Sequence, residues 1–265
     1  MRVSVRTAMV LLVAVTYADT AHAQSEGELA KEAQNPIASL ISLPFQSNTN
    51  FGVGPNDATQ EVLNIQPVVP FKLGDDWNLI TRTILPLIYQ PAIPGLSGDT
   101  FGLGDLNPTL FFSPAGSGLT WGFGPSFLLP TATADVLGGG KWAAGPAAVV
   151  VDTSGPWVFG ALISNIWSFA GDSDRADINR LLVQPFVNYN LSQGWYLTSS
   201  PVVTADWEAA SDQRWTVPIG GGVGKILRIG TQPVNMSLQG YWNAVSPDNG
   251  SDWTIRFQVQ FLFPR

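Results

Sequence analysis

The sequence predicts an all-β fold, a single antiparallel transmembrane β-barrel of about 12 strands with a short N-terminal periplasmic helix. Three observations support this prediction. Of the 265 residues only 12% are charged, about half the share found in an average soluble domain. Apolar and polar side chains alternate with the period of two that is typical of strands. Short and long connections also alternate between the expected strands, as they do in outer-membrane barrels.

The start of the chain is expected to be a signal peptide over residues 1–23. Arg2 and Arg6 make a basic beginning, residues 8–15 are apolar, and Ala21-His22-Ala23 is a small-residue cleavage site. We therefore expect a mature chain that begins at Gln24, outside the cytoplasm.

The expected mature chain lacks the side chains that most enzymes and zinc sites use. The sequence has no cysteine and 1 histidine, His22, which lies in the expected signal peptide. A Ser-His or Cys-His nucleophile therefore cannot form, and the commonest zinc ligands are missing. We predict that the protein is not an enzyme, that it has no catalytic or cofactor-binding residues, and that it needs no cofactor. We also expect no nucleic-acid partner.

A short helix is expected directly after the signal peptide. The stretch 24–34 is polar apart from Leu29 and a few alanines, and it stops ahead of Pro36, because the residue before a proline avoids the α conformation. We expect 24–36 to form an N-terminal periplasmic segment and 37–265 to form the barrel.

Period-two alternation runs through the rest of the chain. In 252–263, for example, Trp253, Ile255 and Phe257 alternate with polar residues such as Arg256. Expected strands of about 9 to 14 residues exceed the usual globular length and match the roughly 9 to 11 tilted residues that cross a bilayer. The expected strands are 37–45, 61–72, 77–90, 101–113, 119–130, 141–151, 157–169, 178–191, 195–207, 214–227, 232–245 and 252–263.

The connections between these strands alternate in length, and with an even number of strands both ends of the chain fall on the short-turn side. Short connections are expected at 74–76, 114–118, 152–156, 192–194 and 228–231, and longer ones at 46–60, 91–100, 131–140, 170–177, 208–213 and 246–251.

Tryptophans gather near the ends of the expected strands. The sequence has 10 of them, and all avoid the strand centres. This placement favours two aromatic girdles at the membrane interfaces. The alternative is only the general preference of strands for aromatic residues.

Prolines fall inside the expected strands, where each removes a hydrogen-bond donor from a wall that has no free edge. Most lie about seven residues from the nearest short turn, so we hypothesise a belt of bulges at one height of the barrel. The prolines concerned are Pro67, Pro86, Pro108, Pro125, Pro146, Pro185, Pro201 and Pro218.

The polar face of each strand is expected to line the lumen, because the apolar face would meet lipid. Amides and hydroxyls dominate it, with few charges of mixed sign, which favours neutral or weakly charged solutes over selected ions. The alternative is a plugged interior in which the arginines pair with the aspartates. The lumen-lining candidates are Arg82, Asp105, Asn107, Arg180, Gln184, Asn188, Asp206, Gln239, Arg256 and Gln258.

Acidic residues cluster in the expected loop 170–177. Asp172, Asp174 and Asp177 are weak candidates for a metal site, because their spacing resembles a calcium loop without its glycine and its terminal glutamate. We therefore predict no dedicated metal site, and the usual alternative for such a cluster is a solvated loop.

Several stretches resemble a family of bacterial outer-membrane barrels. They are LAKEAQNPIASLISLPFQSNTNFG (29–52), WNLITRTILPLIYQP (77–91), GLGDLNPTLFFSP (102–114), WTVPIGGGVGKILRIGTQPVNMSLQGYWN (215–243) and IRFQVQFLFPR (255–265). The family is named for the meta-pathway of phenol degradation, and its members are labelled transporters or mislabelled neuromedin U. The resemblance implies a barrel, an outer-membrane location and the passage of small solutes, aromatic compounds among them. It implies no catalytic or ligand-binding residues.

These features favour an outer-membrane transporter or channel for small, neutral or weakly charged organic solutes. The expected partners are outer-membrane lipid, a small-molecule solute and the outer-membrane assembly machinery. Two alternatives stay open at this point. One is a structural barrel with a closed lumen, and the other is a secreted soluble β-protein that binds carbohydrate through its tryptophans.

Overall fold

The computed structural model describes residues 26–92, 98–116 and 119–264. The expected signal peptide, 1–23, and the expected mature start at Gln24 lie outside the described residues. The elements are α1 (Glu26–Ala33), β1 (Ile41–Val53), β2 (Ala58–Ile65), β3 (Val68–Leu73), β4 (Trp77–Gln90), β5 (Thr100–Leu103), β6 (Asn107–Pro114), β7 (Thr120–Leu128), η1 (Asp135–Leu137), β8 (Lys141–Ser154), β9 (Trp157–Gly171), β10 (Asn179–Asn190), η2 (Ser192–Gly194), β11 (Trp195–Ser199), β12 (Val203–Asp206), β13 (Trp215–Ile229), β14 (Gln232–Val245) and β15 (Trp253–Phe263).

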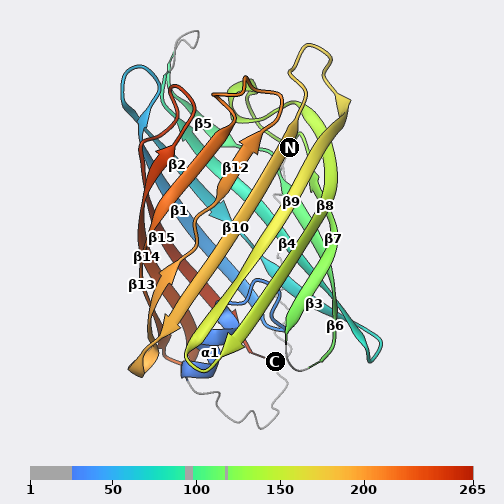
Figure 1. Ribbon diagram of the computed structural model, residues 1–265, viewed down its shortest axis with the longest axis vertical. Coiled ribbons are helices and arrows are strands. Elements are labelled where there is room, and N and C mark those ends of the chain that lie inside the picture. The colour runs from blue at the N-terminus through green and yellow to red at the C-terminus, as the bar shows by residue number, and fades with distance from the viewer. Residues whose placement is uncertain (1–25, 93–97, 117–118, 265) are drawn as a thin grey trace, which may run out of the picture.

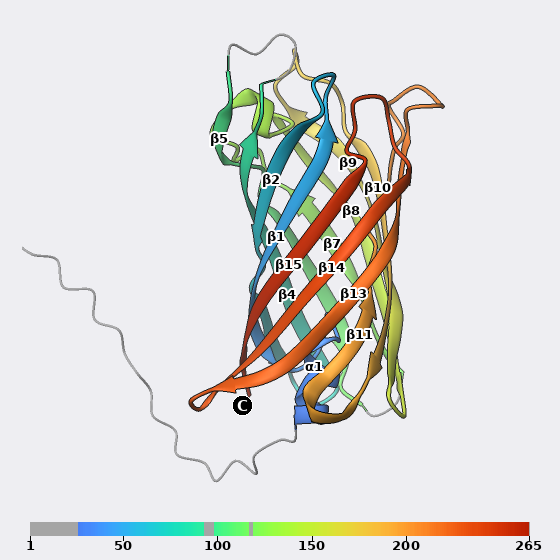
Figure 2. The same ribbon diagram turned by 90° about the vertical axis from the view of Figure 1, so that its left-hand side faces the viewer.

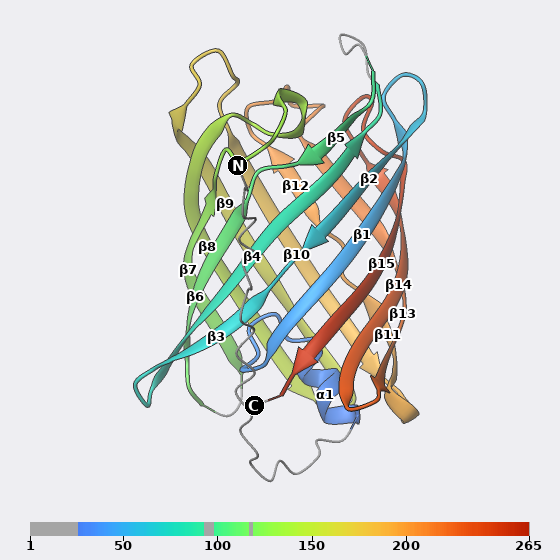
Figure 3. The same ribbon diagram turned by 180° about the vertical axis from the view of Figure 1, so that it is seen from behind.

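The strands form one closed antiparallel barrel (Figure 1). β2 with β3, β5 with β6, and β11 with β12 are each one interrupted strand, so the 15-stranded sheet is a wall of 12 strands. The wall closes where β15 returns to β1, in a register that runs from Ile41 opposite Phe263 to Phe51 opposite Trp253 (Figure 3). The predicted all-β barrel with one short N-terminal helix is confirmed.

The two ends of the barrel differ in the length of their connections, as predicted. The tight connections 74–76, 155–156, 191–194 and 230–231 lie together at one rim, here called the short-turn end. Longer connections, among them 129–140, 172–178, 207–214 and 246–252, lie at the opposite rim, the long-loop end (Figure 1).

The first strand differs from the prediction. A strand at 37–45 and a loop at 46–60 were expected, whereas β1 runs from Ile41 to Val53 and β2 already begins at Ala58. Polar residues stand on both faces of 46–50, so the alternation that marks the other strands disappears there. Asn48, in this stretch, is buried in the lumen and donates a hydrogen bond to the carbonyl of Val62 at 3.3 Å.

The hypothesis of a continuous belt of proline bulges is wrong. Pro67 and Pro201 lie in breaks between strands, Pro108 follows the break between β5 and β6, and Pro218 sits at a register shift. A proline has no N–H to give to the ladder, so interrupting the strand removes the need for that bond. The other prolines of the set lie within unbroken strands: Pro86, Pro125, Pro146 and Pro185.

The outer wall is apolar and carries aromatic residues at both rims. All 10 tryptophans are exposed, and the wall between them presents residues such as Ile163, at 47%, and Leu238, at 54%. Trp77 contacts Trp121 near the short-turn end, and Trp242 contacts Trp253 near the long-loop end. Such a surface fits lipid between two interfaces and does not fit a secreted soluble protein. No helix among the described residues is long and apolar enough to cross a membrane.

Candidate functional site

The chain ahead of β1 folds into the barrel at the short-turn end, where Figure 2 shows α1 beside the lower rim. Leu29 is 0% exposed and packs with Ile226 and Leu262, whose side chains point inward from β13 and β15. Ala38 and Leu40 belong to the same cluster. The helix is therefore held by burial of its apolar face against the lumen wall.

A second group of contacts fixes the end of this segment. Gln34 exchanges two hydrogen bonds with Asn190 of β10, at 2.9 and 3.1 Å. Ile37 is 3% exposed and joins an apolar cluster with Ile80 and Phe111 on the inner wall. Residues 26–40, here called the plug segment, thus cross the short-turn mouth and contact the wall on more than one side.

Beside the plug segment lies a partly open cavity of about 150 Å³. Its lining comes from the plug segment and from inward-facing positions of β1, β3, β4, β9, β10, β11, β14 and β15, because alternate residues of a strand point to the same side. The lining includes these predicted lumen residues: Arg82, Gln184, Asn188, Gln239, Arg256 and Gln258.

Arg256 joins three strands on one side of the cavity. Its Nε donates to Asn48 Oδ1 at 3.0 Å, and its Nη1 donates to the carbonyl of Ser200 at 2.8 Å. Its guanidinium lies 4.9 Å from the ring centre of Tyr241, whose hydroxyl accepts a hydrogen bond from the Ser200 N–H at 2.9 Å. The N–H and the carbonyl of Ser200, in the break between β11 and β12, thereby find hydrogen-bond partners in the lumen.

Arg82 stands on another part of the lining and makes fewer contacts. Its Nη2 donates to Gln66 Oε1 at 2.9 Å, and Gln66 lies in the break between β2 and β3. Val68, on the neighbouring strand, is in register with Arg82 and also lines the cavity.

The remaining predicted lumen residues lie elsewhere. Arg180 and Asp206 form an ion pair at 3.4 Å toward the long-loop end, where their side chains are 52% and 39% exposed. Asp105 accepts hydrogen bonds from the backbone of Ala132 at 3.1 Å and Gly139 at 2.6 Å and so holds the loop 129–140. Asn107 donates to Ser126 at 3.2 Å.

The alternative of an interior in which the arginines pair with aspartates applies to Arg180 alone. Arg180 pairs with Asp206, while Arg82 and Arg256 use amide and carbonyl oxygens instead. Among the described residues, neither Arg82 nor Arg256 forms an ion pair.

Sequence reasoning missed three residues that contact Arg256. Asn48 and Ser200 lie where the strand pattern is weak, in the misplaced first strand and in a strand break. Tyr241 shares the inward, buried face of β14 with Gln239, and its place at an odd-numbered position of that alternating strand could have identified it.

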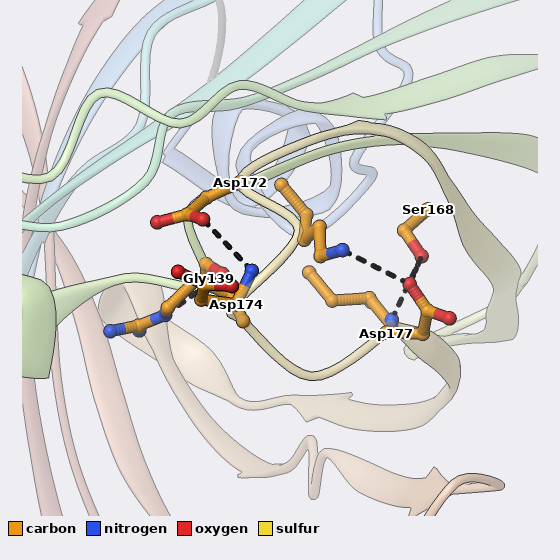
Figure 4. A network of polar contacts seen from close by, with 8 residues as sticks. Gly139, Ser168, Asp172, Asp174 and Asp177 are labelled. Atoms are coloured by element: carbon orange, nitrogen blue, oxygen red, sulfur yellow. Dashed lines mark hydrogen bonds and ion pairs between the residues drawn. The ribbon is translucent and has the colours of Figure 1, made fainter.

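The acidic loop 172–178 does not gather its carboxylates at one point (Figure 4). Asp172 accepts a hydrogen bond from the Asp174 N–H at 2.9 Å, whereas Asp177 accepts from Lys141 Nζ and from Ser168 Oγ, each at 3.2 Å. The hydrogen bond from Lys141, followed by that from Ser168, lowers the pKa of the Asp177 carboxyl below its usual value. No group of three or more acidic or histidine side chains able to hold a metal ion occurs in the described part of the chain.

Comparisons with known proteins agree with the architecture. No protein-family model and no curated protein matches the chain. Its structure is similar to the COG4313 outer membrane channel from Pseudomonas putida F1, with a TM-score of 0.63 and 19% identity over 84% of this chain and 94% of that one. The two chains therefore share the β-barrel fold, which has 12 strands in this protein.

Two further solved structures match more weakly. The CymD monoaromatic hydrocarbon channel has a TM-score of 0.46 and 10% identity, covering 91% of each chain. LpxR from Salmonella typhimurium has a TM-score of 0.43 and 10% identity, covering 84% of this chain and 100% of that one.

Proposed function

We propose that the protein is an outer-membrane channel for small, neutral or weakly charged organic solutes, aromatic compounds included. The observation that carries this proposal is the contrast between the two faces of the wall. Outward residues are apolar, as at Ile163 and Leu238, while the lumen holds a cavity lined by amides, hydroxyls and two arginines beside a few apolar side chains. A lipid-facing wall around a polar interior is the arrangement that passes solutes through an outer membrane.

The structural likeness to a protein described as an outer membrane channel also supports the proposal. The short-turn end would then face the periplasm, because outer-membrane barrels place their tight turns there. Outer-membrane lipid and the assembly machinery of that membrane would be the partners of the wall. The small-molecule solute would be the partner of the cavity.

The plug segment would act as a gate at the periplasmic mouth. It contributes no strand to the wall, so the barrel can stay closed when the segment moves. It is held by two apolar clusters and by the Gln34–Asn190 pair. Release of these contacts would join the cavity to the periplasmic side.

Solute uptake into liposomes tests the proposed function directly. The refolded protein is placed in liposomes, and swelling is followed with small neutral aromatic solutes and with sugars as larger polar controls. The proposal predicts swelling with the small solutes and much slower swelling with the sugars. Folding is checked by a heat-modifiable shift in gel mobility, so that a misfolded sample is not counted as a closed channel.

A structural barrel with a closed lumen is the second candidate. The specific observation in its favour is the plug segment, whose Leu29 and Ile37 are both nearly inaccessible to solvent. Folded protein that passes no solute, with or without residues 24–40, would favour this candidate over the channel.

A further inference from the structure

We propose that the lumen cavity binds a small monocarboxylate with an apolar body about the size of one aromatic ring. Arg82 is the group that recognises the carboxylate. The inference rests on the proposed channel function and gives its solute a chemical class.

The cavity is unusually rich in positive charge for a chain with a formal net charge of −7. Arg82 and Arg256 both line it, and Glu32 of the plug segment is the one carboxylate among its described lining residues. The ion pairs of Lys141 with Asp177 and of Arg180 with Asp206 lie at the long-loop end and involve neither arginine of the cavity. Two cations that share a cavity without a carboxylate bonded to either attract an anion.

The two arginines differ in how many of their donors the protein uses. A guanidinium has five N–H donors in a fixed fork. Arg256 gives bonds to Asn48 and to the Ser200 carbonyl and lies over Tyr241, so it has a clear structural task. Arg82 gives one side-chain bond, to Gln66. The other N–H groups of the Arg82 guanidinium can donate to both oxygens of a carboxylate, which is the preferred bidentate geometry.

Apolar residues stand across the cavity from this charge. Leu162 on β9 and Phe186 on β10 both line the cavity. In the strand order, β9 and β10 are separated from β4 by β6, β7 and β8, which places them nearly opposite Arg82 in a wall of 12 strands. A ligand with its charged group toward β4 can therefore rest its apolar part on these two side chains.

The size of the cavity limits the apolar part. A volume of about 150 Å³ equals that of engineered cavities which hold one benzene molecule. A single ring that carries one carboxylate fits this volume, whereas a long acyl chain is too large for it. Benzoate is the simplest probe of this class, and benzamide is its uncharged counterpart of nearly the same shape.

Calorimetric titration of the folded full-length protein in detergent micelles tests the inference. Benzoate is expected to bind at least tenfold more tightly than benzamide. Arg82→Gln should weaken benzoate about tenfold to hundredfold, the range for loss of a charge-assisted hydrogen bond, and should leave benzamide little changed. Arg180→Gln is the matched control, because Arg180 is ion-paired with Asp206 and does not line the cavity.

Three results would overturn the inference: equal affinity for benzoate and benzamide, no benzoate binding, or equal losses from the two substitutions. The comparison of the two ligands on the unaltered protein needs no variant, so it decides the question even if Arg82→Gln does not fold. Liposome uptake separates this inference from the proposed function. Uptake of neutral aromatics without benzoate binding would refute the carboxylate site alone, and benzoate binding without uptake would refute the channel alone.

Discussion

Shortening one side chain of the plug segment should open the barrel without unfolding it. Leu29 is 0% exposed between α1 and the inner wall, where it packs with Ile226 and Leu262. Truncating such a buried leucine to alanine costs about 2–5 kcal/mol. At about 1.4 kcal/mol for each factor of ten, the population with the segment displaced rises about 30- to 4,000-fold.

Single-channel recording of Leu29→Ala in planar bilayers measures this change. We expect longer or more frequent openings than in the unaltered protein, because the loss falls on the bound state of the segment. The wall should keep its stability, since α1 adds no hydrogen bonds to the ladder. Leu63→Ala is the matched control, because Leu63 faces outward from β2 and is 36% exposed.

Two results would refute this reasoning. If the openings of Leu29→Ala equal those of the unaltered protein in a folded barrel, the plug segment does not limit conduction. If Leu63→Ala produces the same increase, the effect comes from a general loosening of the wall and not from the plug.

Three other substitutions test separate parts of the structure. Arg256→Met should lower the free energy of unfolding by about 1–3 kcal/mol for each buried acceptor left without its donor, here the Asn48 side chain and the Ser200 carbonyl. A urea titration followed by gel shift measures this loss, and an unchanged unfolding midpoint would contradict the importance of these bonds. Leu238→Arg, at the centre of β14, should cost about 2–4 kcal/mol if that face meets lipid, and an unaltered folding yield in vesicles would contradict the lipid-facing wall. The pKa of Asp177 is lowered in the folded state by Lys141 and Ser168, so its contact is present at neutral pH and is lost as the pH falls through that lowered value. Limited proteolysis of the loop 172–178 should therefore speed up in acid, and Asp177→Asn should remove this pH dependence.

The barrel itself was predictable because lipid and lumen impose opposite demands on alternate residues. β4 and β14 match their predicted ranges, 77–90 and 232–245, and most other strands differ by only a few residues at their ends. In these strands an apolar residue such as Leu238 stands beside a polar one such as Gln239. The period of two is then unambiguous.

The interior could be predicted only in part, because the plug segment changes what the lumen must accommodate. Ile37 was expected in a strand, yet it enters the lumen and packs on the wall. The inner face of β8 is accordingly apolar, with Val149 and Val151 almost fully buried. Alternation cannot identify an inward face that is itself apolar, and a segment that packs across the barrel leaves no local pattern.

The sequence allowed pairing of the lumen arginines with aspartates as an alternative, but it could not decide which partner each arginine takes. Arg180 meets Asp206 because the two lie opposite each other in the β10–β12 register. Arg256 meets Ser200 through a strand break. Registers and breaks depend on how the whole wall closes, which residue types alone do not reveal.

The most direct test of the central claim is the single-channel conductance of the refolded chain with and without residues 24–40. The claim is that a polar-lined barrel is gated at its short-turn mouth by the plug segment. It predicts discrete openings for the intact chain and a larger, more persistent conductance after the deletion. Silence from both proteins, each shown to be folded by its gel shift, would contradict the claim.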